Sequence, residues 1–270
     1  MNTDEVNGPR RRDAEVARVD VLGIPIACVD MAGTVAAIGR FLDTREPCDQ
    51  GRYICFRDVH GVVLAQDDPL LMKAHHDAFM VVADGKPLAI LGRLRGGAIG
   101  QVRGIQSVPT LCEAGIAKGW RHFFLGGGPG VADDLAAEMS ARYPGLIVAG
   151  TECPAFRQLS AGATDDMVDR INAARPDLVW VGLGSPKQDI WMSRIAQRLD
   201  GAMCLGVGAA FDIHTGRVAE APPWIRRAGM EWAFRVSQEP RRLARRYLHA
   251  IPRFLALVAV EQWLHKPGMR

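Results

Sequence analysis

The chain has 270 residues, of which 48% are hydrophobic and 23% are charged, and its formal net charge at pH 7 is +3. These values are ordinary for a soluble globular protein with one large domain, or with one domain and an appendage. No apolar run reaches the roughly 18–20 residues that a membrane-spanning helix requires, so we expect no transmembrane segment.

The N-terminal segment 1–20 is charged and polar and contains no apolar stretch. It therefore predicts a disordered tail and not a secretory signal. The six cysteines show neither CxxC spacing nor a Cys/His pattern, and Cys28, Cys55 and Cys204 lie in apolar runs. We therefore expect buried free thiols in a reducing cytoplasm, and no structural zinc site.

Short apolar runs alternate with helical patterns along most of the chain. The runs predict strands at 21–29, 53–56, 79–82, 121–125, 146–150, 177–182 and 202–206. Helical patterns are expected between them, at 31–42, 68–76, 87–94, 108–118, 131–143 and 164–174. This alternation predicts an α/β fold, in which residues 21–216 form a Rossmann-like, doubly wound, mostly parallel sheet.

Two strand ends carry candidate functional residues. Asp84 follows the strand at 79–82, the position where an α/β fold places working side chains, but it could equally be the N-cap of the next helix. Gly126, Gly127 and Gly128 lie between a strand and a helix, an arrangement that predicts a phosphate-binding loop. The downstream acidic residue of a dinucleotide-binding fingerprint is missing, which argues against a nicotinamide oxidoreductase.

The next two strands also end in glycines followed by polar residues. Gly184, Lys187 and Gln188 come after the strand at 177–182, and Gly208 and Asp212 come after the strand at 202–206. Because the carboxyl ends of parallel strands share one edge of a sheet, we expect a ligand site there. The alternative is that these glycines only make tight turns.

The C-terminal segment 217–270 has a different composition from the rest of the chain. It carries ten Arg and one Lys against four Glu, a charge of +7, so the first 216 residues sum to −4. We expect a basic, amphipathic helical appendage that either packs on the sheet or binds an anionic membrane surface. Its closely spaced arginines are Arg226, Arg227, Arg241, Arg242, Arg245 and Arg246.

Several long motifs, in the same order along the chain, resemble those of the WecG/TagA/CpsF family of bacterial glycosyltransferases. They lie at 124–132, 181–191, 206–212, 221–232 and 239–243. The resemblance extends from Gly23 to Leu264, nearly the whole chain. It implies an inverting, metal-independent transfer of a sugar from a UDP-sugar to a polyprenyl-diphosphate-linked acceptor, in the synthesis of cell-envelope or exported polysaccharide.

The resemblance also implies a location and a set of partners. The protein is expected to be cytoplasmic and peripheral on the inner face of the cell membrane. Its partners would be the UDP-sugar, the lipid-linked acceptor and the membrane surface. We expect neither a nucleic-acid partner nor a cofactor. The protein could form a homo-oligomer. The Asp-x-Asp metal clamp of many other glycosyltransferases is absent from the sequence, and no metal site is expected.

The resemblance assigns roles to single residues. Asp84 matches the family's catalytic aspartate, the base that would deprotonate the acceptor hydroxyl. Gln188 matches a position that faces the substrate. Asp212 matches a position near the nucleotide. The other candidates for substrate or nucleotide binding come from their positions at the strand ends; they are Asp58, Gly126, Gly127, Gly128, Gly184, Lys187 and Gly208. The six arginines above would contact the acceptor diphosphate or the membrane.

Three positions depart from the family pattern. Phe56 stands where the family commonly has threonine, and Gln101 and Gln106 replace an arginine and an aspartate. Because Asp84 is kept, we expect an enzyme with altered specificity. The alternative is a catalytically weakened member that binds a nucleotide-sugar or a lipid head group as a regulatory module.

Overall fold

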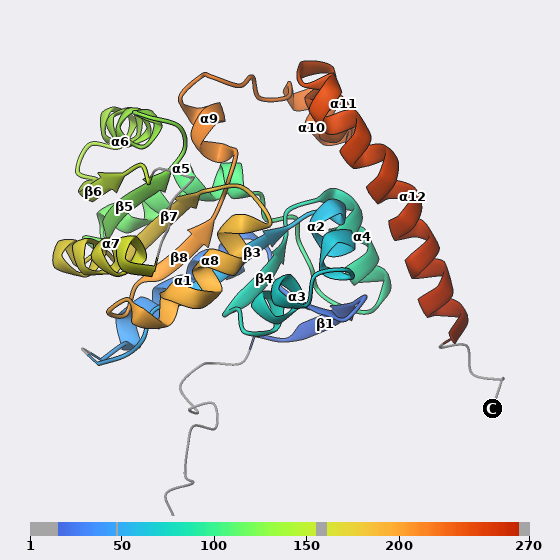
Figure 1. Ribbon diagram of the computed structural model, residues 1–270, viewed down its shortest axis with the longest axis horizontal. Helices are drawn as coiled ribbons and strands as arrows, with labels where there is room; N and C mark the ends of the chain where they lie inside the picture. The colour runs from blue at the N-terminus through green and yellow to red at the C-terminus, as the bar shows by residue number, and fades with distance from the viewer. Residues whose placement is uncertain (1–15, 47, 155–160, 265–270) are drawn as a thin grey trace, which may run out of the picture.

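The computed structural model describes residues 16–46, 48–154 and 161–264. These residues form an α/β fold with an eight-stranded sheet in the order β1-β2-β4-β3-β8-β7-β5-β6 (Figure 1). The strands are β1 (Arg18–Val21), β2 (Ile24–Ala27), β3 (Arg52–Arg57), β4 (Met80–Ala83), β5 (Arg121–Gly126), β6 (Ile147–Glu152), β7 (Leu178–Gly182) and β8 (Met203–Gly206). All neighbours pair in parallel except β1 with β2. The predicted mostly parallel, Rossmann-like sheet is confirmed.

Helices cover both faces of this sheet, as the doubly wound prediction requires. One apolar cluster joins the sheet to α2 (Val59–Ala65), α3 (Pro69–His76), α4 (Lys86–Leu94), α7 (Ala161–Ala174), α8 (Lys187–Ile195) and α12 (Pro240–Leu264). The other joins it to α1 (Met31–Thr44), α5 (Gly104–Ile116), α6 (Val131–Arg142) and α9 (Ala210–His214). A 3₁₀ turn, η1 (Ala196–Arg198), follows α8, and α10 (Pro223–Ala228) and α11 (Glu231–Gln238) precede α12.

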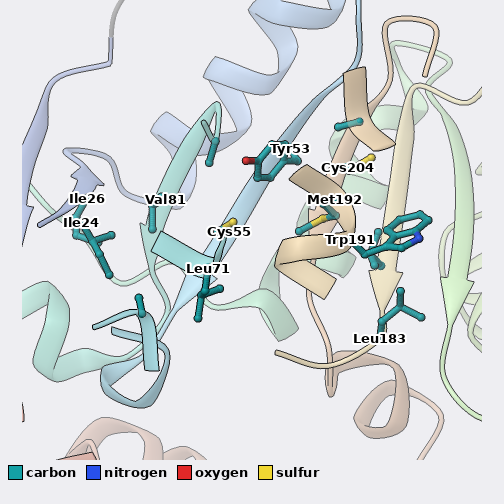
Figure 2. Close-up of a cluster of buried hydrophobic side chains, with 14 of the residues drawn as sticks. Ile24, Ile26, Tyr53, Cys55, Leu71, Val81, Leu183, Trp191, Met192 and Cys204 are labelled. Atoms are coloured by element: carbon teal, nitrogen blue, oxygen red, sulfur yellow. The ribbon is translucent and has the colours of Figure 1, made fainter. Parts of the chain in front are cut away.

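The side chains of β3 show how the two clusters share one strand. Tyr53 and Cys55 belong to the first cluster, part of which is drawn in Figure 2, whereas Ile54 and Phe56 belong to the second. Successive side chains of a strand point to opposite faces, so a central parallel strand must be apolar on both. This is why the run at 53–56 has no polar alternation.

The N-terminal boundary differs from the prediction. The apolar run at 21–29 is not one strand but the second half of a hairpin, whose turn places Leu22 and Gly23 at positive φ. Strand β1 begins at Arg18, so the predicted tail 1–20 extends at least three residues too far. Its residues 1–15 lie outside the described part of the chain.

Helix α2 was not predicted from the sequence. Asp58 is its N-cap and accepts a hydrogen bond from the Gly61 backbone N–H at 2.8 Å. The predicted cap at Asp68 is confirmed, because its carboxylate accepts from the N–H groups of Leu70 and Leu71.

The C-terminal helices pack on this core. Helix α12 lies along α2, with Leu243, Ala250 and Phe254 buried (Figure 1). Two ion pairs attach it further, Arg253 to Asp67 and Glu261 to Arg95. None of the helices within the described ranges combines the length and the apolar character that crossing a membrane demands.

Candidate active site

A cavity of about 450 Å³ opens at the carboxyl edge of the sheet. Strand β3 has β4 as its neighbour on one side and β8 on the other. After β4 the chain crosses to β5 and β6, on the far side of β8, and then returns through β7 to β8. Loops that leave neighbouring strands in opposite directions open a crevice between them, the usual ligand position in open α/β sheets. The cavity is lined by the loops after β3, β4, β5, β7 and β8 and by residues of the C-terminal segment.

Asp84 lies in this cavity, immediately after β4. Its side-chain Oδ1 accepts a hydrogen bond from the backbone N–H of Gly104, the first residue of α5, at 2.8 Å. The N-cap of α4 is Gly85, without a side-chain hydrogen bond, so the capping alternative for Asp84 is wrong. The carboxylate is therefore held in the cavity by a helix other than the one that follows it.

The surroundings of Asp84 keep its proton affinity high. Burial raises the pKa of this carboxyl from 3.8 to about 6, the Gly104 N–H lowers it, and nearby Asp58 raises it. The guanidinium groups of Arg103 and Arg235 act in the lowering direction. A carboxylate with a pKa near 6 is ionised at neutral pH and still basic enough to accept a proton.

Gln188 is buried and connects the two glycine loops that the sequence predicted to meet. Its Oε1 accepts from the Gly184 N–H at 3.0 Å, and its Nε2 donates to the Gly206 carbonyl at 2.6 Å. A Cβ at Gly206 would lie 3.1 Å from that Nε2, so a larger residue there would crowd the amide. Gln188 thus fixes the loops after β7 and β8, both of which line the cavity.

The three glycines of the loop after β5 do not all line the cavity. Gly127 and Gly128 line the cavity, whereas Gly126 is outside it. Gly126 has a φ of +117°, and a Cβ there would lie 2.7 Å from the carbonyl carbon of Gly182. Gly127 donates its N–H to the Gly182 carbonyl at 3.0 Å. Close packing against β7 therefore accounts for the first glycine, and only the later ones face the cavity.

The other predicted binding residues divide into two groups. Asp58, Gly184, Gly208 and Asp212 line the cavity with Asp84 and Gln188. The cavity lining does not include Lys187, Arg226 or Arg227. The side chains of Arg241, Arg242, Arg245 and Arg246 lie outside the described part of the structure.

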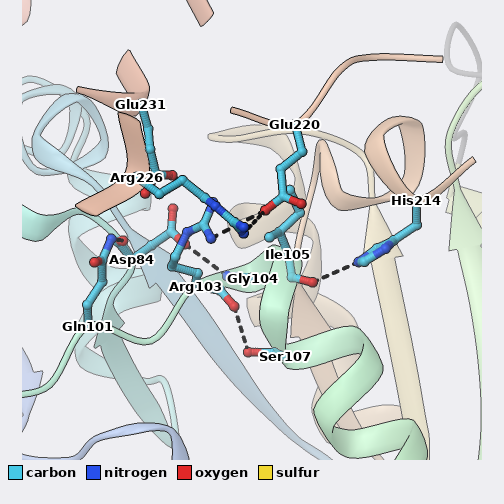
Figure 3. A network of polar contacts seen from close by, with 10 residues as sticks. All are labelled: Asp84, Gln101, Arg103, Gly104, Ile105, Ser107, His214, Glu220, Arg226 and Glu231. Carbon is cyan, nitrogen blue, oxygen red and sulfur yellow. Dashed lines mark hydrogen bonds and ion pairs between the residues drawn. The ribbon is translucent and has the colours of Figure 1, made fainter. Parts of the chain in front are cut away.

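Sequence reasoning missed Arg57, which is described below, and four further charged residues of the cavity. They are Arg103, before α5, Glu220, in the segment leading to α10, and Glu231 and Arg235, on α11 (Figure 3 shows the first three). Arg103 pairs with Glu231 at 2.7 Å and with Glu220 at 3.4 Å. The signal available was the position of Arg103 at a helix start; the other three belong to a segment that was interpreted only as an appendage.

A buried ion pair supports the floor of the cavity. Arg57, at the end of β3, donates to Asp189 on α8 at 2.7 Å and to the Ser185 hydroxyl at 2.9 Å. Both charged side chains are almost completely buried. A Cβ at Gly61 would lie 2.8 Å from the Arg57 guanidinium, so this close approach requires glycine. The pair fixes α8, and with it Gln188, against β3.

The three departures from the family pattern have different surroundings. Phe56 is buried and lines the cavity. Gln101 donates from Nε2 to the backbone carbonyl of Asp84 at 2.8 Å, so it positions the loop after β4 without carrying charge. Gln106 is exposed and is not part of the cavity lining. In the residues described, no group of three or more His, Cys, Asp or Glu could hold a metal ion.

The chain matches a known family and is similar to named transferases. The model described as "Glycosyl transferase WecG/TagA/CpsF family" matches residues 19–268. A relative from Bacillus spizizenii is 26% identical over 198 residues, which cover 72% of this chain and 73% of the relative. One from Staphylococcus aureus is 24% identical over 247 residues, 91% of this chain and 94% of the relative. Both bear the name N-acetylglucosaminyldiphosphoundecaprenol N-acetyl-beta-D-mannosaminyltransferase.

Proposed function

From the premise that this chain belongs to the WecG/TagA/CpsF family of glycosyltransferases, we propose that it transfers a sugar from a UDP-sugar to an acceptor carried on a polyprenyl diphosphate. The names of the relatives specify an acceptor of this chemical type, a sugar on diphosphoundecaprenol. The observation that carries the proposal is the ionisable Asp84 at the strand edge, with its raised pKa and with two arginines beside it. Membership of this family leaves no support for a nicotinamide oxidoreductase.

The proposed reaction is a single displacement at the anomeric carbon of the donor. Asp84 accepts the proton of the acceptor hydroxyl while that oxygen forms a bond to the anomeric carbon. The bond from this carbon to the diphosphate oxygen breaks, and UDP leaves with the electron pair. Attack opposite to the leaving group inverts the configuration. Backbone N–H groups of the loops and the guanidinium of Arg235 would stabilise the leaving diphosphate, so the proposed reaction needs no metal.

Arg235 is suited to this task. It lines the cavity from α11 and lies close enough to Asp84 to lower the pKa of that carboxyl. The described residues offer its guanidinium no carboxylate at ion-pair distance, unlike Arg57 and Arg103. A guanidinium without a carboxylate partner keeps its donors for the oxygens of a phosphate.

A transfer assay tests the proposal directly. The protein is incubated with a panel of UDP-sugars and an N-acetylglucosaminyl-diphosphate lipid, and the product is analysed for its anomeric configuration by NMR. We expect one donor to react with inversion, and EDTA to leave the rate unchanged. A retained configuration would contradict the single displacement. Loss of activity with EDTA, restored by Mg²⁺ or Mn²⁺, would contradict the metal-independent mechanism.

A second candidate function is a regulatory module that binds the nucleotide-sugar or the lipid head group without turnover. It is motivated by Gln101, whose neutral amide is engaged with the backbone of Asp84 where an arginine was expected. The variant Gln101→Arg/Gln106→Asp separates the two functions. If wild type transfers no sugar and the double variant does, the regulatory function is favoured; activity of wild type excludes it.

We also propose that the protein is peripheral on the cytoplasmic face of the membrane, and that α12 makes the contact. The outward side of this helix carries Leu248, Leu255 and Trp263, which are 76%, 62% and 57% exposed. These residues lie on one face, opposite the buried Ala250 and Phe254. A face of exposed apolar side chains on an amphipathic helix is typical of helices that lie in the membrane interface.

Vesicle sedimentation tests this location. Truncation before α10 would remove the buried Phe254, so point substitutions are the cleaner experiment. The variant Leu255→Glu/Trp263→Glu should lose binding to anionic vesicles, whereas Ile116→Glu, an exposed residue of α5 on the other face of the sheet, should not. If both variants bind anionic vesicles equally well, α12 does not contact the membrane.

A further inference from the structure

Arg103 occupies an unusual place in the cavity, because its guanidinium is enclosed by carboxylates of the C-terminal segment. Its Nη2 lies 2.7 Å from Glu231 and its Nη1 lies 3.4 Å from Glu220 (Figure 3). The side chain is only 10% exposed. Residues more than a hundred positions apart thus meet in the lining of the cavity.

The charge of the cavity is at odds with a diphosphate ligand. Its lining has five carboxylates but only three guanidinium groups, those of Arg57, Arg103 and Arg235. Arg57 is already neutralised by Asp189 in a buried pair. With Arg103 also paired, Arg235 alone would meet an incoming diphosphate, and the two nearby glutamates would repel it.

The carboxylate pair, Glu220 and Glu231, takes up the donors that a phosphate would use. A guanidinium presents its N–H groups in a planar fork that fits carboxylate and phosphate oxygens equally. The oxygens of the carboxylate pair therefore stand where phosphate oxygens would bind. We propose that Arg103 is a diphosphate-binding residue, which the carboxylate pair holds in the empty site and releases to the donor diphosphate. This rests on the proposed function, because it takes the ligand to be a nucleoside diphosphate.

The carboxylate pair keeps favourable contacts after Arg103 leaves. Glu220 also accepts a hydrogen bond from Arg226 at 2.5 Å. Glu231 is the first residue of α11, where the helix dipole stabilises a negative charge. Neither carboxylate is therefore left without a favourable contact when Arg103 is released. The free-energy cost of exchanging a carboxylate oxygen for a phosphate oxygen on the Arg103 guanidinium is therefore moderate.

The backbone around Arg103 is independent of this exchange. The next residue, Gly104, keeps its N–H on Asp84, and a Cβ at Gly104 would lie 3.4 Å from Val207, close to the opposite loop. Only the Arg103 side chain must turn, while Asp84 stays in position. Arg103 is thus placed to bind the leaving group while the Gly104 N–H keeps the Asp84 carboxylate in place.

Binding of UDP and of inorganic diphosphate, measured by isothermal titration calorimetry on the full chain, tests the proposal. Glu231→Gln weakens the hold on Arg103, so we expect about tenfold tighter binding of both ligands. Arg103→Gln should weaken binding about tenfold or more. In the combination Arg103→Gln/Glu231→Gln the gain from the glutamine should disappear, because no guanidinium remains to be released.

The matched control is Glu261→Gln, which breaks a similarly exposed ion pair, with Arg95, away from the cavity. It should leave the affinity for UDP unchanged. If Glu231→Gln weakens UDP binding or does not change it, Arg103 and the carboxylate pair only hold α11 in place, and the proposal is overturned. Thermal melting of each variant identifies loss of fold, and Arg103→Lys, which keeps the charge but not the fork, is the substitute if Arg103→Gln does not fold.

Transfer assays and binding measurements together separate the transferase reaction from the role of Arg103. If the affinities of the variants for diphosphate follow the expected order but no sugar is transferred, Arg103 is supported as the residue that binds the anion. The transferase reaction is then contradicted. If the protein transfers sugar but Glu231→Gln leaves its affinities for UDP and diphosphate unchanged, the transferase reaction is supported and the role of Arg103 is overturned.

Discussion

Replacement of Asp84 by asparagine should make the protein more stable and nearly inactive. Asparagine has almost the same shape, and its Oδ1 can still accept the hydrogen bond from the Gly104 N–H. What changes is the charge, because the carboxylate must be ionised at neutral pH in a site that raises its pKa from 3.8 to about 6.

The sign of the stability effect follows from this shift. A carboxyl whose pKa is raised on folding binds its proton more tightly in the folded state than in the unfolded state. Its favourable contribution is fully present below pH 3.8 and is lost as the pH rises through about 6. The shift corresponds to at most about 3 kcal/mol, and access of water to the open cavity reduces this to about 1–3 kcal/mol.

Urea denaturation between pH 4 and pH 8 measures the effect. Asp84→Asn should have a larger free energy of unfolding than wild type at pH 7, and the difference should shrink towards pH 4. Turnover should fall about 10²–10⁴-fold while UDP binding is kept, and kcat/KM of wild type should rise with pH up to about 6. Asp134→Asn, which removes an exposed carboxylate paired with Arg217, is the control and should change neither property.

Two results would refute this reasoning. Turnover within tenfold of wild type in Asp84→Asn would remove Asp84 as the base. A stability difference that does not depend on pH would show that the carboxylate is not held in an environment that opposes its ionisation.

Three further substitutions test the support of the site. Arg57→Met leaves Asp189 as an unpaired buried charge and should cost about 3–5 kcal/mol in urea denaturation, whereas Arg57→Met/Asp189→Leu should recover most of it; equal loss in both would refute the pair's role. Gln188→Leu removes both loop contacts, so we expect a loss of about 1–3 kcal/mol and weaker UDP binding by calorimetry, and unchanged affinity would contradict the loop-fixing role. Gly126→Ala forces a Cβ against Gly182 at positive φ and should lower stability by about 2–3 kcal/mol, and an unchanged melting temperature would contradict that close contact.

Local sequence pattern was sufficient for the parallel part of the sheet and for part of the site, but not for the hairpin of β1 and β2. Apolar runs that end at glycine or aspartate predict buried parallel strands, and parallel strands bring their carboxyl ends to one edge. Asp84, Gln188 and the glycines after β5, β7 and β8 were found in this way, because each is fixed by its position relative to its own strand. Helix α2 was missed because Val59–Ala65 combines β-branched residues with a glycine, a weak helical pattern. It forms where the Asp58 cap and the packing against α12 favour it.

The tertiary structure alone decided which charges meet in the cavity. Arg103 is 117 and 128 positions from Glu220 and Glu231, and Arg57 is 132 positions from Asp189. Such partners come together only after α8 has packed on β3 and the C-terminal helices have folded back over the edge of the sheet. Periodicity records which face of a helix is apolar, but it does not record which other helix that face covers. The segment 217–270 could therefore be recognised as basic and helical from its sequence, while its contribution of Glu220, Glu231 and Arg235 to the site depended on long-range packing.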